Sequence, residues 1–78
     1  MSINFDLHDL QAFVAVAEFK SFRKAAEFVN ISQPAFSRRI EKLEQSLGVK
    51  LIDRNTRSME LTNVGRDFSR KARHILDN

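Results

Sequence analysis

The 78-residue sequence predicts a mainly α-helical fold, in which three short helices precede a two-stranded hairpin and a further helix. Apolar residues recur three or four positions apart in several segments, which is the spacing of one helix face. Residues typical of helix ends separate these segments, and two β-compatible runs flank a charged turn. A chain this short has room for one core, so we expect a single small domain.

The first two predicted helices cover about residues 7–19 and 22–29. Each has one apolar face, formed by Leu7, Leu10, Val14 and Ala17 in the first and by Phe22, Ala25, Ala26 and Val29 in the second. Asp6 and Ser21 precede these helices as typical N-caps, and Asn30 suits the left-handed turn after the second. The two alanines allow another helix to approach closely, which predicts a tight crossing.

The third predicted helix covers about residues 33–47, after Ser32 as N-cap and before Gly48 as a stop. Its apolar stripe consists of Phe36, Ile40, Leu43 and Leu47. Its opening turn is polar instead and contains Ser32, Gln33, Pro34, Ser37 and Arg38. About three residues connect it to the preceding helix, as in a helix-turn-helix. In that motif the second helix enters the DNA major groove by its N-terminal residues, so the polar turn is expected to reach base edges.

After the third helix, the runs VKLI (49–52) and MEL (59–61) predict a hairpin with the charged tip DRNTRS. Arg54 and Arg57 lie in this tip. Arginine side chains can enter the minor groove, where the negative potential of DNA is concentrated. We therefore expect a winged helix-turn-helix, three helices plus a two-stranded wing, with Arg57 favoured for the minor groove.

The last predicted helix starts after Thr62 as N-cap and reaches Asn78 without a stop signal. Its apolar stripe consists of Val64, Phe68, Ala72, Ile75 and Leu76. The preceding helices have their own faces to bury, so this stripe is expected to need a partner. We expect a homodimer through residues 63–78 that binds double-stranded DNA at an interrupted palindrome.

Composition argues against several classes of protein. The net charge is +3, and the positive charge lies after Asn30, which favours an anionic partner. No cysteine is present, which excludes thiolate sites and fits a reducing cytoplasm. No segment is apolar enough to span a membrane, His8 and His74 have no ligand-spaced partners, and no glycine-rich phosphate loop occurs. We therefore expect no membrane, metal, cofactor or enzymatic activity.

The motifs SFRKAAEFVNISQPAFSRRIEKLEQSLGVKLIDR and LTNVG carry a resemblance to a known family. From Leu7 through the final helix, the chain closely resembles the N-terminal DNA-binding domain of the LysR-type transcriptional regulators. The resemblance implies a winged helix-turn-helix in residues 1–61 and, in residues 62–78, the start of a long linker helix that dimerises. It also implies a C-terminal effector-binding domain, absent from this chain, through which a small-molecule effector would act. The full-length protein would be cytoplasmic, bound to the nucleoid, and a dimer or tetramer.

Two residues depart from the family pattern. Lys20 stands where the family usually has glycine, which puts the turn between the first two helices in question. Ile52 stands where phenylalanine is common, which concerns packing under the wing. Neither position belongs to the expected DNA contacts.

The residues expected to contact DNA are Ser32, Gln33, Pro34, Ser37, Arg38, Arg54 and Arg57. Gln33 can read adenine or be a solvated first-turn residue, and Pro34 can touch a thymine methyl group or only start the helix. Arg54 can contact DNA or pair with Asp53 or Glu60. Arg39 lies nearer the core edge and can snorkel to solvent. The alternative function is a winged-helix module for protein interaction without sequence-specific DNA binding.

Overall fold

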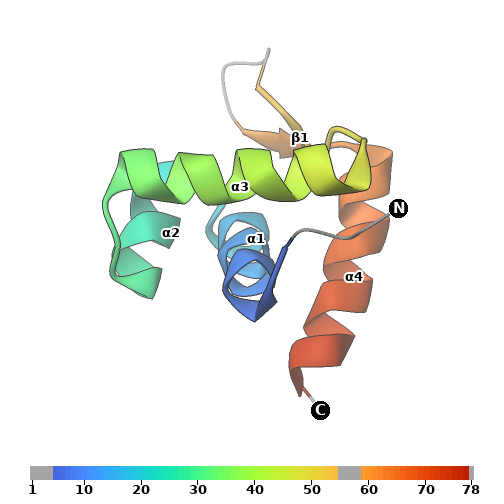
Figure 1. Ribbon diagram of the computed structural model, residues 1–78, viewed down its shortest axis with the longest axis horizontal. Coiled ribbons are helices and arrows are strands. Elements are labelled where there is room, and N and C mark those ends of the chain that lie inside the picture. The colour runs from blue at the N-terminus through green and yellow to red at the C-terminus, as the bar shows by residue number, and fades with distance from the viewer. Residues whose placement is uncertain (1–4, 55–58, 78) are drawn as a thin grey trace.

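The computed structural model describes residues 5–54 and 59–77, and it confirms a mainly α-helical fold with a two-stranded antiparallel sheet. The elements are α1 (Leu7–Phe19), α2 (Phe22–Val29), α3 (Gln33–Leu47), β1 (Ile52–Asp53), β2 (Glu60–Leu61) and α4 (Asn63–Asp77). In the view of Figure 1 the hairpin rises above α3, whereas α1 and α2 lie below it. α4 runs down past the end of α3 that is farther from α2.

The helix ends coincide with the residues that the sequence predicts as caps. Asp6 and Asp9 form a reciprocal capping box at the start of α1, with both hydrogen bonds at 3.1 Å. The Ser21 hydroxyl accepts from the Lys24 amide, and the Ser32 hydroxyl accepts from the Ala35 amide. Since each cap acts within one helical turn, local sequence is sufficient to place these boundaries.

Two non-glycine residues of the described chain adopt the left-handed conformation, and both follow a helix. Asn30 has φ of 67° and Lys20 has φ of 53°. Asparagine tolerates this region, whereas lysine has no side chain that compensates for the steric strain. The departure of Lys20 from the family pattern therefore falls on a position with a conformational reason for glycine.

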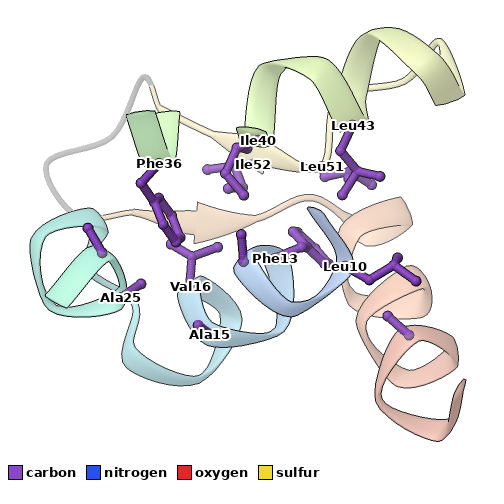
Figure 2. Packing of buried hydrophobic residues seen from close by; sticks show 13 residues of the cluster. Leu10, Phe13, Ala15, Val16, Ala25, Phe36, Ile40, Leu43, Leu51 and Ile52 are labelled. Carbon is purple, nitrogen blue, oxygen red and sulfur yellow. The ribbon is translucent and has the colours of Figure 1, made fainter. Parts of the chain in front are cut away.

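The core lies where α3 crosses α1. Figure 2 shows Phe36, Ile40 and Leu43 pointing from α3 toward Phe13 and Val16 of α1, and all five are fully buried. Ala25 and Ala26 of α2 are also buried, as the close crossing requires. This arrangement fixes which side of α3 faces the interior, so the opposite side of its first turn faces solvent.

A buried carboxylate ties α1 to α3. Asp9 is 0% exposed, and its Oδ2 lies 3.0 Å from Lys42 Nζ while its Oδ1 lies 3.8 Å from Arg39 Nη1. From the sequence, Arg39 was expected only at the core edge, where it can snorkel to solvent. Because a buried charge is stable only when it is paired, these two cations help to hold α3 at its angle across α1.

The hairpin is shorter than predicted, and its first strand is displaced. Residues 49–52 were expected as a strand, but β1 is Ile52–Asp53, with Ile52 opposite Leu61 and Asp53 opposite Glu60. The segment before β1 makes other hydrogen bonds. The Leu51 amide donates to Glu44 Oε2 at 2.8 Å, and the Leu51 carbonyl accepts from the Thr62 amide at 3.0 Å. Leu51 therefore connects α3 to the start of α4 through its backbone hydrogen bonds and does not belong to the strand.

The start of α4 lies against this junction. Thr62 caps α4, since its hydroxyl accepts from the Gly65 amide at 2.9 Å and donates to the Lys50 carbonyl at 2.7 Å. A Cβ atom added to Gly65 would lie 2.1 Å from the Leu51 carbonyl oxygen. Only glycine fits at this approach, which gives the glycine of the LTNVG motif a physical explanation.

Candidate nucleic-acid interface

The first turn of α3 presents the predicted recognition residues on one side. Gln33, Pro34 and Arg38 are exposed, and Ser37 is half-buried. Ser32 is exposed and acts as the N-cap, so its hydroxyl already accepts one hydrogen bond. Within residues 5–54 and 59–77, Arg38 has no ion-pair partner. This turn therefore offers an uncommitted guanidinium and an uncommitted amide on a helix whose other side is fixed in the core.

Arg54 of the wing lies next to this turn. Its guanidinium carbon is 4.8 Å from the centroid of the Phe22 ring, and its Nη1 is 4.0 Å from Glu41 Oε2. From the sequence, Asp53 and Glu60 were the expected ion-pair alternatives, whereas the pair that the structure defines for Arg54 is with Glu41. Arg54, Phe22 and Met59 line an open pocket of about 320 Å³ together with Gln33 and Ser37. The base of the wing and the recognition turn thus form one continuous surface.

Arg57, the residue favoured for the minor groove, lies outside the described residues. Arg57 at the minor groove remains a prediction.

The apolar stripe of α4 is divided between two environments. Phe68 packs on Phe13 with ring centroids 5.7 Å apart, Ala72 is fully buried, and Leu76 is half-buried against the core. Val64 and Ile75 remain 49% and 55% exposed. The expectation that the whole stripe is left over is therefore corrected, because α4 packs on α1 through its inner residues and leaves an outer apolar face.

A second apolar surface lies away from the recognition turn. A pocket of about 630 Å³ is lined mainly by α1 and α2, with Leu76 of α4. Phe19 and Phe28 both line it, with ring centroids 5.2 Å apart and ring planes tilted by 53°, and Phe28 is exposed. Its lining contains no residue of α3 or of the described wing, so it is separate from the candidate nucleic-acid interface.

Sequence reasoning missed two members of the interface. Phe22 was assigned to the apolar face of α2, but its ring also lies under the guanidinium of Arg54. Glu41 was not among the expected site residues, although it stands one helical turn after Ser37 on the same side of α3. That spacing was the available signal for Glu41, whereas the approach of the wing to Phe22 has no local signature.

No helix in the described ranges is long and apolar enough to cross a membrane. A helix-turn-helix with a two-stranded wing beside its second helix defines the winged helix-turn-helix class of DNA-binding domain. The chain belongs to the lysR family of bacterial regulatory helix-turn-helix proteins, whose sequence profile matches residues 7–66. It is the DNA-binding domain of a LysR-type transcriptional regulator.

Individual relatives agree with this assignment. The SDS degradation transcriptional activation protein of a Pseudomonas species is 51% identical over 72 residues, which cover 92% of this chain and 24% of the relative. The probable cat1 operon transcriptional activator of Acinetobacter lwoffii is 45% identical over 71 residues, which cover 91% of this chain and 23% of the relative. The chain therefore spans about a quarter of the length of these relatives.

Solved structures give the same fold. The BenM DNA-binding domain in complex with benA site 1 DNA is 42% identical with a TM-score of 0.91, and the match covers 95% of this chain and 83% of that one. Vibrio fischeri DarR in complex with DNA is 42% identical with a TM-score of 0.90, over 95% of this chain and 25% of that one. Both comparisons confirm the winged helix-turn-helix expectation.

Proposed function

We propose that this domain binds double-stranded DNA with the first turn of α3 in the major groove and the wing at the minor groove. The observation that carries the proposal is the exposure of Gln33, Pro34 and Arg38 on a turn whose inner side is anchored by fully buried Phe36 and Ile40. Side chains on such a fixed turn are held in register before DNA binds, as the docking geometry of a helix-turn-helix requires.

The residue types on this turn match the chemistry of base edges. The Gln33 amide can pair with N6 and N7 of adenine, and the Arg38 guanidinium can pair with O6 and N7 of guanine. Pro34 offers an apolar surface that suits a thymine methyl group. These contacts would supply sequence preference.

Other groups of the interface suit the DNA backbone. Ser32 and Ser37 present hydroxyl groups at the start of α3, where free amides and the helix dipole favour a phosphate. Arg54 and Arg57 belong to the wing, with Arg57 assigned to the minor groove. Such contacts set the position of the domain on the duplex and do not by themselves select its sequence.

The domain acts as a homodimer through α4 in this proposal. Val64 and Ile75 are eleven positions apart and thus point within about 20° of each other around the helix axis. They form an outer apolar face, supported by Phe68, Ala72 and Leu76 packed beneath it. Two-fold pairing of this face would place two recognition helices on one side of the duplex, so the site would be an interrupted palindrome.

The remaining organisation follows from the family. Residues 1–61 would form the winged helix-turn-helix, and residues 62–78 would begin the linker helix to an effector-binding domain. Regulation by a small molecule, and a tetrameric assembly, would require that further domain. The protein would act in the cytoplasm on the nucleoid, without enzymatic activity of its own.

Selection of bound sequences from a random duplex pool tests this proposal. We expect an interrupted palindrome, with half-sites about one helical turn or a multiple apart. Gln33→Ala should weaken binding to the selected site by about 1–3 kcal/mol and relax preference at one base pair of each half-site. Gln45→Ala is the matched control, because Gln45 is exposed near the other end of α3.

The affinity should also fall steeply as salt is added. In a plot of log affinity against log salt concentration, each neutralised phosphate should steepen the slope by about 0.9. Absence of any enriched sequence, together with a flat salt response, would instead indicate the protein-interaction module. Equal losses for Gln33→Ala and Gln45→Ala on all sequences would contradict the role assigned to Gln33.

A further inference from the structure

Arg54 stands on an aromatic support that reaches into the core. Its guanidinium lies 4.8 Å over the Phe22 ring, and that ring meets Phe36 edge to face, with centroids 5.7 Å apart and an interplanar angle of 82°. Phe36 is 0% exposed and is held between α1 and α3. The position of Arg54 is thus coupled through two rings to the same core residue that anchors the recognition turn.

The contact with Phe22 leaves the N–H groups of Arg54 available for hydrogen bonds. A cation–π contact uses the charge of the guanidinium and needs no hydrogen-bond acceptor, and the group carries five N–H donors in one plane. The contact with Glu41 is 4.0 Å long, which is an ion pair without a hydrogen bond. A ligand that accepts a forked pair of hydrogen bonds can therefore bind Arg54 without displacing it from Phe22.

The pocket beside Arg54 has the chemistry of a site for one phosphate. Its lining combines the Arg54 guanidinium and the Ser37 hydroxyl with the apolar surfaces of Phe22 and Met59. Gln33 lines the same pocket and is the residue assigned to base reading. An anion bound between Arg54 and Ser37 would lie next to the base-reading side chain.

We propose that Phe22 is a positioning residue that holds Arg54 over the recognition turn, so that Arg54 and Ser37 bind one DNA phosphate and fix the register of Gln33. This inference rests on the proposed function, since it requires the first turn of α3 to face DNA. It goes further in assigning a backbone contact to a pair of residues from the wing and α3, and a role in DNA recognition to an aromatic residue of α2. Arginine suits this role better than lysine because only its planar fork stacks and donates a bidentate pair together.

The test compares salt dependence in matched variants on the selected duplex. Arg54→Gln should reduce the log-log salt slope by about 0.9 per bound subunit, the value for one phosphate contact. Phe22→Leu, which keeps an apolar side chain against Phe36, should reduce the slope in the same direction, whereas Phe22→Tyr should preserve it. The double variant Phe22→Leu/Arg54→Gln should have the slope of Arg54→Gln alone. Arg70→Gln is the control, because Arg70 lies on the exposed side of α4 and pairs with Asp67.

A scan with single methylphosphonate substitutions then locates the contact. One position in each half-site should weaken binding of the parent domain and leave binding of Arg54→Gln and Phe22→Leu unchanged. If Phe22→Leu lowers affinity equally at all salt concentrations and keeps the parental slope and methylphosphonate pattern, Phe22 has only a structural role and the inference is overturned. If the parent domain itself binds no duplex, the proposed function fails before this comparison. The two failures are therefore distinguishable.

Discussion

Replacing Glu44 by alanine should destabilise the domain more than any exposed charge substitution. Glu44 is 7% exposed, and its Oε2 accepts hydrogen bonds from the Leu51 amide at 2.8 Å and the Ile52 amide at 3.2 Å. Leu51 and Ile52 are themselves buried. Alanine would leave both amides without an acceptor at the junction of α3, the wing and α4.

The magnitude follows from the two hydrogen bonds. A hydrogen bond to a charged group contributes about 1.5–3 kcal/mol, so removing both acceptor contacts should cost about 3–6 kcal/mol. The free energy of unfolding of a domain of this size is about 4–12 kcal/mol in total. The Glu44→Ala variant would therefore retain little of the parental stability. Glu44→Gln keeps a neutral acceptor for the same amides and should lose only about 1–3 kcal/mol.

Urea unfolding followed by circular dichroism measures these differences, with Glu27→Ala as the control. Glu27 is exposed and pairs with Arg23, and pairs of this kind contribute about 0.3–0.5 kcal/mol. In Glu44→Gln, hydrogen exchange of the Leu51 and Ile52 amides should accelerate relative to the parent by more than exchange of the amides in the α1 core. A Glu44→Ala variant within about 0.5 kcal/mol of the parent, the usual range of neutral surface changes, would refute the reasoning.

Three further predictions concern backbone fit and assembly. Gly65→Ala should destabilise by about 1–3 kcal/mol in urea unfolding because its Cβ would lie 2.1 Å from a main-chain oxygen, and an unchanged midpoint would contradict this close approach. Lys20→Gly should stabilise the domain by about 0.5–1 kcal/mol in the same assay. It removes the steric strain of a lysine at φ 53°, and the greater conformational entropy of glycine in the unfolded chain offsets part of this gain. Val64→Glu with Ile75→Glu should sediment as a monomer that binds a half-site weakly, whereas Lys24→Glu, with the same change in net charge, should still associate; a dimeric double variant would exclude the outer face of α4.

The helix boundaries were predictable because they depend on neighbouring residues. Asp6, Ser21, Ser32 and Thr62 each accept a hydrogen bond from an amide three positions ahead, so a short window of sequence contains both partners. The apolar stripe of α3 was equally readable, and it correctly indicated which side of the recognition turn faces solvent. The exposed positions of Gln33 and Arg38 follow directly from that periodicity.

The polar contacts between elements were not predictable in this way. The sequence around Asp9 gives no local sign of its role, because its partners Arg39 and Lys42 belong to another helix. The displaced first strand has the same cause. Leu51 and its neighbours are β-compatible, but the Glu44 carboxylate already occupies the amides that a longer strand would use. Intrinsic strand preference yields to such tertiary contacts.

The candidate interface was predictable only where it depends on local sequence. The recognition turn follows from its position after a helix-turn-helix connection. The contact of Arg54 with the Phe22 ring instead depends on how the wing packs against α2. The proposed dimer surface on α4 could be predicted only in part. A stripe read from sequence cannot separate residues that face the core of their own chain, such as Phe68 and Ala72, from residues that stay exposed, such as Ile75.

Gly65 would link the geometry of the proposed dimer to the geometry of its DNA site. Its contact with the Leu51 carbonyl oxygen sets the closest approach of α4 to the junction, and the Leu51 amide is bound in turn by Glu44 of α3. The start of α4 is thus joined to the end of α3 through one residue. In a dimer that pairs through Val64 and Ile75, this joint determines the distance and angle between the two recognition helices. A substitution that displaces α4 at Gly65 should therefore alter the preferred half-site spacing, while the bases read by Gln33 within each half-site stay the same.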